Sequence, residues 1–333
     1  MKMLIWTGAI LVTLVVVFLL GPKPPTPTFD ASLPLIQANS LAELEKSITA
    51  SEAKFHIKPE NESRITWAND TAKTQTEYAV IYLHGFSASP KEGDPIDIEF
   101  ARHYGANLYR PRLSEHGLVS DSPLENLTPD GYIASATEAL AIGKKLGKKV
   151  ILMGCSTGCT LALYLASQHP EDVQALILYS PNIDLYDGTS ALLPMPWGEK
   201  LASAVIGGSY YTPNVVGDEA KYWYGKYHIK GLVALKQLVN GTMTDETFKK
   251  IKQPVFVGYY YKDEQRQDNT VSVKRIEEMF DAISTPDGLK TKKAFPNAGV
   301  HAIVSRFTSG SVPEIKAETD KFAREILKMK PGN

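Results

Sequence analysis

The stretch GCSTG, residues 154–158, constrains the fold of this chain more than any other because of its position. A short apolar run at residues 150–153 leads directly into it, as expected of a strand buried on both faces. Residues 157–169 then have the length and composition of a helix, which Pro170 ends. The pattern predicts a buried strand that turns at once into a helix, with Ser156 at the turn.

The same alternation of strands and helices runs along most of the chain. Strands are predicted at residues 65–67, 78–83, 106–113, 150–153, 173–180, 254–260 and 289–294. Helices are predicted at residues 40–50, 95–104, 130–146, 157–169, 271–283 and 313–329. Alternation at this spacing indicates βαβ units, and so an α/β fold whose central sheet is mostly parallel and flanked by helices.

The alternation stops at about residues 182–253, which we interpret as a helical insertion within a single domain covering residues 40–333. The insertion is rich in aromatic side chains, and for each ring a place in the insertion's own core is the preferred interpretation over substrate contact. These aromatic residues are Tyr186, Trp197, Tyr210, Tyr211, Tyr222, Trp223, Tyr224 and Tyr227.

The N-terminus differs from the rest of the chain. Residues 3–20 carry no charge and are long enough to cross about 30 Å of hydrocarbon. A cleaved signal peptide is the alternative, but no small-x-small cleavage site follows the apolar run. We therefore expect a transmembrane anchor at residues 1–21, a stiff proline-rich linker at residues 22–39, and a membrane-anchored domain on the extracytoplasmic side.

The overall charge and the cysteine content exclude several classes of protein. The formal net charge is −1, so no strong field would attract nucleic acid. The two cysteines, Cys155 and Cys159, lie too close together to form a disulfide framework, and no metal-ligand spacing is present. We interpret both as small core residues.

The turn at Ser156 predicts chemistry as well as structure. In G-x-S-x-G between a strand and a helix, the flanking glycines give room for a tight turn that exposes the serine hydroxyl. A serine attacks well only when a base removes its proton. His301 is the histidine that follows the last predicted strand, in the chain order Ser, acid, His that is typical of this arrangement.

The loop after residues 254–260 offers three acids to orient that histidine. We favour Asp268 over Asp263, with Glu264 third, because the run after Asp268 has the pattern common after this strand.

The negative oxygen formed during acyl transfer needs backbone donors. We expect one from the N–H of Thr157, directly after the serine, and one from the N–H of Phe86, in the loop after residues 78–83. Neighbouring His84 is interpreted as a side chain that braces this loop rather than as a second base.

Three segments and two late residues carry a resemblance to a known family: LHGFSASP (83–90), RLSEHG (112–117), GCSTG (154–158), Asp268 and His301. The chain resembles the α/β-hydrolases, in particular the carboxylesterase and monoacylglycerol-lipase-like group. The resemblance implies hydrolysis of carboxylic esters through a Ser-Asp-His triad and an acyl-enzyme. It also implies a lid formed by the insertion, and neither a metal nor an organic cofactor. A membrane anchor beside an apolar lid favours lipid-derived esters as a hypothesis, and short-chain esters stay open.

Two other functions stay open on the sequence. An aminopeptidase or amidase could use the same triad, with an acid of the insertion binding a substrate amine. The available acids are Glu199, Asp218 and Glu219. A membrane-tethered binding protein with an inactive hydrolase fold is the third interpretation, although candidates for all three triad positions are present.

Overall fold

The computed structural model of the chain describes residues 6, 13 and 15–332. Its centre is a seven-stranded sheet in the order β1-β3-β2-β4-β5-β8-β11. Only β1 runs antiparallel to its neighbour, so the expectation of a mostly parallel sheet is confirmed. The strands are β1 (Arg64–Thr66), β2 (Thr76–Leu83), β3 (Asn107–Arg110), β4 (Gly147–Cys155), β5 (Val173–Tyr179), β8 (Val255–Tyr259) and β11 (Lys290–Ala294).

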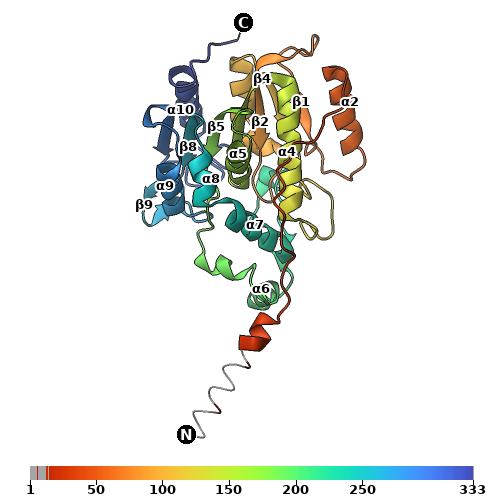
Figure 1. Ribbon diagram of the computed structural model, residues 1–333, viewed down its shortest axis with the longest axis vertical. Coiled ribbons are helices and arrows are strands. Elements are labelled where there is room, and N and C mark those ends of the chain that lie inside the picture. Colours follow the sequence, from red (N-terminus) through yellow and green to blue (C-terminus); the bar gives the residue numbers. More distant parts are fainter. Residues whose placement is uncertain (1–5, 7–12, 14, 333) are drawn as a thin grey trace.

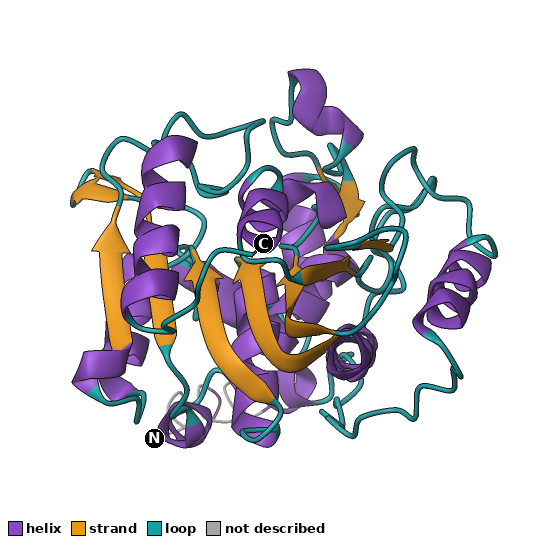
Figure 2. Ribbon diagram, turned by 90° about the horizontal axis from the view of Figure 1, so that it is seen from above, coloured by secondary structure: helices purple, strands orange, loops and turns teal. Residues whose placement is uncertain are grey.

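Helices cover both faces of this sheet, as Figures 1 and 2 show. One face carries α4 (Pro129–Leu146), α5 (Thr157–Gln168) and α9 (Val273–Ala282), and the other carries α3 (Ile96–His103) and α10 (Val312–Glu325). Buried side chains of β2 alternate between the two cores, with Ile81 and Leu83 on the first face and Val80 and Tyr82 on the second. The sheet is therefore the middle layer of a three-layer domain.

The ends of several helices follow from local sequence signals. Helix α2 (Leu41–Glu52) begins after Ser40, whose side chain accepts a hydrogen bond from the Glu43 N–H. Helix α4 begins after Thr128, whose hydroxyl oxygen accepts one from the Gly131 N–H, with Pro129 at the first helical position.

The predicted insertion lies between β5 and β8 and contains six short elements. They are η2 (Gly188–Leu192), α6 (Gly198–Ile206), β6 (Tyr210–Tyr211), η3 (Gly217–Lys221), β7 (Tyr227–His228) and α7 (Ile229–Thr242). Strands β6 and β7 pair, and α6 packs against α7 at one end of the molecule (Figure 1). The next helix, α8 (Asp245–Lys250), contacts α5 and α9 and so belongs to the core layer.

The predicted transmembrane anchor at residues 1–21 falls largely on residues outside the described part of the chain. Within the described part, no helix is both long and apolar enough to span a bilayer. The prediction of a membrane-anchored, extracytoplasmic protein is therefore wrong.

Residues 22–31 follow the surface of the domain and are bonded to it (Figure 1). The Pro22 carbonyl accepts a hydrogen bond from the Trp197 N–H of the insertion at 2.9 Å. Further along, the Phe29 N–H donates to Asp130 at 2.8 Å, and the Phe29 carbonyl accepts from the Tyr164 hydroxyl at 2.7 Å. This segment connects the insertion to α4 and α5.

Candidate active site

Ser156 lies at the junction of β4 and α5 in a backbone conformation that is rare for a residue with a side chain. Its φ is 53° and its ψ is −118°. Four backbone hydrogen bonds hold this conformation: the Ser156 N–H donates to Tyr179 O at 2.9 Å, and its carbonyl accepts from the N–H groups of Cys159 (2.9 Å), Asn182 (3.1 Å) and Thr160 (3.3 Å). The strained turn that the GCSTG pattern predicts is therefore present in the structure.

The end of β2 packs so closely against both glycines of the motif that neither position has room for a side chain. A Cβ atom at Gly158 would lie 1.8 Å from the Leu83 carbonyl oxygen, and one at Gly154 would lie 2.8 Å from the same atom. This close approach also brings the loop after β2 to the serine, since a Cβ at Gly85 would lie 3.2 Å from Ser156 Cβ. The turn and the predicted oxyanion loop are thus adjacent.

Asp268 and His301 come together from the loops after β8 and β11. His301 Nδ1 lies 2.6 Å from Asp268 Oδ2. The other oxygen of this buried carboxylate accepts from the N–H groups of Thr270 (2.9 Å) and Val271 (3.2 Å). These bonds fix the carboxylate, so it can hold the imidazole in one orientation.

The second nitrogen of His301 is left available. Its Nε2 is buried and has no hydrogen-bond partner among the described residues. Since Nδ1 donates to Asp268, Nε2 of the neutral ring carries the lone pair that could take a proton. Burial alone would lower the pKa of His301, but the charge and the hydrogen bond of Asp268 outweigh it and raise that pKa above 6.5.

Ser156 and His301 are linked through the end of β5. Tyr179 O accepts from the Ser156 N–H, and the next residue, Ser180, donates its hydroxyl to the His301 carbonyl at 2.7 Å. Ser156, Asp268 and His301 follow β4, β8 and β11 in the parallel sheet, so all three lie at its carboxyl edge.

The competing acids lie elsewhere. The loop after β8 forms a hairpin of β9 (Tyr261–Asp263) and β10 (Arg266–Gln267), where the sequence predicted irregular structure. Asp263 is paired with Arg266, whose Nε lies 2.8 Å from its carboxylate, and Glu264 accepts a hydrogen bond from the Tyr261 hydroxyl at 3.1 Å. Both carboxylates are therefore engaged within the hairpin, and the structure places only Asp268 of the three beside His301.

The two predicted oxyanion donors both lie near the serine in the chain or in space: Thr157 follows it directly, and Phe86 follows Gly85, where a Cβ would lie 3.2 Å from Ser156 Cβ. Among the described residues, neither the Phe86 N–H nor the Thr157 N–H has a hydrogen-bond acceptor. Thr157 is the first residue of α5, where N–H groups point out of the helix and favour negative charge. Both amides are therefore available to an incoming oxygen.

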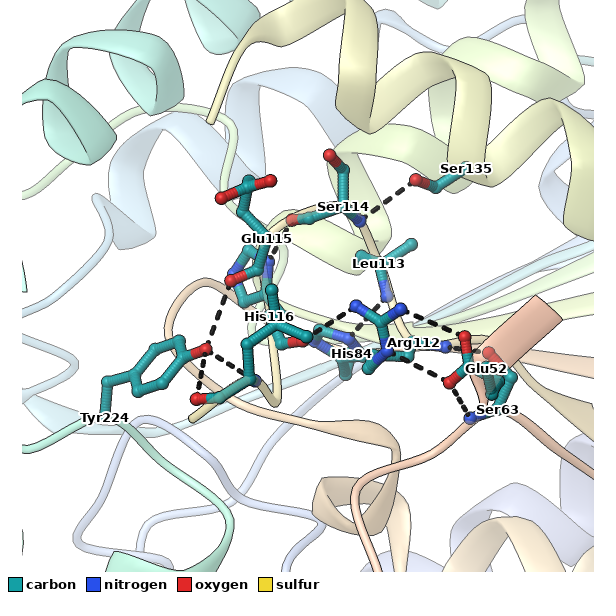
Figure 3. Close-up of polar contacts among 11 residues, drawn as sticks. Glu52, Ser63, His84, Arg112, Leu113, Ser114, Glu115, His116, Ser135 and Tyr224 are labelled. Carbon is teal, nitrogen blue, oxygen red and sulfur yellow. Dashed lines mark hydrogen bonds and ion pairs between the residues drawn. The ribbon is translucent and has the colours of Figure 1, made fainter. Parts of the chain in front are cut away.

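Two buried histidines, His84 and His116, hydrogen-bond the loop that carries Phe86. Figure 3 shows both rings beside the segment after β3. His84 Nδ1 lies 2.9 Å from the Gly85 carbonyl, and its Nε2 accepts from the Leu113 N–H at 3.1 Å. His116 Nδ1 lies 2.7 Å from the Ser114 carbonyl, and its Nε2 accepts from the Ser87 N–H at 3.1 Å.

Carbonyl oxygens only accept, so both Nδ1 atoms carry the hydrogen and both rings are neutral. Burial lowers the pKa of His116 to about 4 and that of His84 well below 6.5. His84 thus has the bracing position expected of it, whereas the equivalent position of His116 was not predicted.

The segment RLSEHG completes this support, as Figure 3 shows. Arg112 forms an ion pair with Glu52 at 3.0 Å and donates to the His116 carbonyl at 3.1 Å. The Tyr224 hydroxyl, from the insertion, accepts from the Leu118 N–H at 2.7 Å. The loop after β3 is therefore fixed both to the core and to the insertion.

The insertion also covers the oxyanion loop directly. The Tyr227 ring meets the Phe86 ring edge to face, with centroids 5.0 Å apart. The Tyr224 N–H donates to the Ser87 carbonyl at 2.9 Å. Both tyrosines are buried, but they belong to the core of the main domain rather than to a separate core of the insertion, and Tyr186 and Tyr211 are exposed.

One cavity lies apart from this site, whereas the two cysteines are close neighbours of Ser156 in the chain. A cavity of about 520 Å³ opens between residues 22–27 and the insertion, and Ser156 and His301 are not among its lining residues. Cys155 and Cys159 are buried and unpaired. In the described part of the chain, no group of three or more His, Cys, Asp or Glu side chains could hold a metal ion.

Comparison with curated proteins gives a lipase as a relative of this chain. A thermostable monoacylglycerol lipase of Bacillus sp. (strain H-257) is 30% identical over 106 residues, which cover 32% of this chain and 41% of that relative. The chain thus matches about two fifths of the length of this curated relative.

Solved structures with the same fold include lipolytic enzymes. A structure from work on the metagenome-derived lipolytic enzymes LipS and LipT has a TM-score of 0.64 at 18% identity, covering 81% of this chain and 99% of the other. The monoacylglycerol lipase of Paleococcus ferrophilus has a TM-score of 0.57 at 15% identity, covering 79% and 99%. These likenesses establish the α/β-hydrolase fold.

The family described as serine aminopeptidase S33 (Hydrolase_4) matches residues 132–302, just over half of the chain, including Ser156, Asp268 and His301. Together with the strained serine turn and the mostly parallel sheet, this match shows that the chain is an α/β-hydrolase of the serine aminopeptidase S33 family.

Proposed function

We propose that this protein is a serine hydrolase of carboxylic esters, with Ser156 as nucleophile, His301 as general base and Asp268 as the acid that orients the base. The observation that carries the proposal is the 2.6 Å contact between Asp268 and His301 Nδ1, which leaves Nε2 free at the sheet edge that also holds Ser156.

The reaction follows from these positions in two steps. His301 Nε2 takes the hydroxyl proton as Ser156 Oγ bonds to the ester carbonyl carbon, and the alcohol then leaves with that proton. Water, deprotonated by His301 in the same way, attacks the acyl-enzyme and releases the acid and the free serine. Asp268 stays ionised throughout and stabilises the imidazolium that forms in each step.

Negative charge develops on the carbonyl oxygen in both steps. The N–H groups of Phe86 and Thr157 would bind this oxygen, because both lack an acceptor among the described residues and the loop of Phe86 approaches Ser156 closely. Losing one such donor typically slows acyl transfer about 10²- to 10³-fold.

Lipid-derived esters such as monoacylglycerols are the substrate class we propose. The relatives named as monoacylglycerol lipases support it. The insertion supports it as well, since it places Tyr227 on Phe86 and exposes apolar side chains of α6 at its outer face. These α6 residues are Leu201, Val205 and Ile206.

The three acids of the insertion do not favour an aminopeptidase. Glu199 lines the cavity that includes neither Ser156 nor His301. An acid that binds a substrate amine should be free and directed toward the nucleophile. Asp218 is paired with Lys221 at 2.8 Å, and Glu219 accepts from the Val216 N–H at 2.8 Å. Both acids are exposed in η3 and engaged there.

The test compares the wild-type chain with Ser156→Ala on p-nitrophenyl acetate, octanoate and palmitate and on alanine p-nitroanilide. We expect ester hydrolysis by the wild type, a preference for the longer acyl chains, and a loss of about 10⁴-fold or more in Ser156→Ala. Ser167→Ala is the matched control, because Ser167 is a buried serine of α5 that bonds only within its own helix and to the neighbouring Gln168. Turnover of the anilide without turnover of any ester would contradict the proposal.

A further inference from the structure

A buried carboxylate lies directly behind the oxyanion loop. Glu92, in the short helix η1 (Pro90–Gly93), is only 2% exposed. Among the described residues it pairs with no lysine or arginine. Its Oε2 instead accepts two hydrogen bonds, from the Gly85 N–H at 2.9 Å and from the Tyr82 hydroxyl at 3.0 Å. Burying an acid without a cationic partner is costly, so its position needs an explanation.

The two bonds around Gly85 determine where the next N–H points. Glu92 holds the N–H of the peptide that precedes Gly85, and His84 Nδ1 holds the carbonyl of the peptide that follows it, at 2.9 Å. That second peptide carries the Phe86 N–H on the side opposite the Gly85 carbonyl, because the peptide unit is planar and trans. The direction of the Phe86 N–H is thus set by both anchors.

We propose that Glu92 is a positioning residue: it holds the His84–Gly85 peptide and so, together with the bond from His84, orients the next peptide, which presents the Phe86 N–H to the substrate oxygen. This inference rests on the proposed function, since it assigns to Glu92 the alignment of one oxyanion donor. Glu92 does not touch the substrate in this arrangement. It acts through the loop.

Glu92 also affects the candidate site electrostatically, through the pKa of His301. The titratable groups that face it are Tyr82, Asp97, Tyr132, Cys155, Cys159 and His301. Its negative charge raises the pKa of His301, in addition to the larger effect of Asp268. Burial raises the pKa of Glu92 itself to about 7, against the hydrogen bonds from Gly85 and Tyr82 and the charge of His301.

Two substitutions separate these two effects. Glu92→Ala removes the acceptor, so kcat should fall about 100-fold while KM stays within about threefold, as expected when an oxyanion donor is misaligned. Glu92→Gln keeps an oxygen that can accept from Gly85 and Tyr82. Its kcat should therefore return to within about fivefold of the wild type. The acidic limb of its pH–rate profile should move to lower pH, because the charge that raises the pKa of His301 is gone.

Asp97→Asn provides the matched control. Asp97 is another buried acid on the same face of the sheet, but it accepts from the Ile98 N–H and pairs with Arg110 at 3.8 Å, and it does not contact the oxyanion loop. We expect its kcat to stay within about threefold of the wild type. Thermal unfolding of all three variants shows whether a loss of activity is a loss of folding.

The rate at which a fluorophosphonate modifies Ser156 is measured in parallel, because this reaction needs the oxyanion donors but no ester turnover. Oγ bonds to phosphorus, fluoride leaves, and His301 takes the proton. Slower modification in Glu92→Ala, with recovery in Glu92→Gln, supports the inference even if the wild type hydrolyses no ester, in which case only the proposed function fails. Three results would overturn the inference about Glu92. Folded Glu92→Ala could react as fast as the wild type, both Glu92 variants could lose the same amount of rate, or the wild type could fail to be modified.

Discussion

Histidines of two kinds surround the candidate site, and their partners favour opposite protonation states. His301 donates to the Asp268 carboxylate and keeps Nε2 free, and its pKa lies above 6.5. His116 donates to a carbonyl and accepts from the Ser87 N–H, and burial lowers its pKa to about 4. The first can exchange a proton at Nε2, whereas the second is locked as a neutral brace.

The difference shows that a carboxylate partner, which outweighs the effect of burial on the pKa, separates a candidate base from a structural histidine. A carboxylate stabilises the imidazolium, and an N–H group directed at the ring opposes it. Substitutions at His301 and its partner Asp268 should therefore reduce activity without unfolding the protein, whereas loss of His116 should mainly reduce stability.

The largest effect is expected for His301→Gln. Glutamine fills the space but cannot act as a base at neutral pH, so kcat should fall about 10⁴-fold with the fold intact. Steady-state ester hydrolysis and circular dichroism measure the two properties. His103→Gln, at an exposed histidine of α3, should behave as the wild type. Retention of more than a tenth of the activity in His301→Gln would remove His301 from the mechanism.

Asp268→Asn should come next, with a loss of about 10³-fold or more in kcat, because an amide no longer favours the correct tautomer or the imidazolium. Asp263→Asn is the control from the same loop and should stay within about twofold, since Asp263 pairs with Arg266. The reverse result would mean that the hairpin rearranges and that Asp263 serves as the acid.

Lowering the pH is expected to have a smaller effect, which is a decrease in the free energy of unfolding. Between pH 6.5 and about 4 the unfolded chain protonates His116 and the folded chain does not, so stability is lost as the pH falls through this window. The shift corresponds to about 3 kcal/mol in the free energy of unfolding. His301 has the opposite sign, because its raised pKa adds stability that is present below pH 6.5 and lost as the pH rises through the folded pKa. Glu92, whose pKa is raised to about 7, also has this opposite sign. Urea unfolding from pH 4 to 7 is therefore compared between the wild type and His116→Phe, and the same pH dependence in both would contradict the neutral brace.

The smallest effect is expected for His116→Phe. The ring volume is kept, but the N–H of Ser87 loses its acceptor, which should cost about 1–3 kcal/mol of stability. The activity should fall about 10-fold, because the oxyanion loop loses one of its anchors. An activity loss as large as that of His301→Gln in a folded protein would erase the distinction between the two histidines.

Much of this arrangement could be predicted from the sequence because the signals are local. The serine turn needs only a strand, two glycines and a helix in succession, and all are visible in residues 150–169. Asp268 was preferred over Asp263 from the residues that follow it, and the structure places Asp268 beside His301.

The remaining features depend on contacts between distant segments. The hairpin at β9 and β10 is charged and too short to show strand periodicity. Glu92 and His116 were missed because the burial of a polar side chain is decided by tertiary packing, not by its neighbours in sequence. The predicted anchor falls largely on residues outside the described part of the chain, and the described residues contain no spanning helix.

The most direct test of the central claim is to treat the protein with a fluorophosphonate and map the adduct by peptide mass spectrometry. The proposed triad predicts one adduct, on Ser156, formed in step with the loss of ester hydrolysis and much more slowly in His301→Gln. An adduct on another residue, or ester hydrolysis that survives complete modification of Ser156, would contradict it.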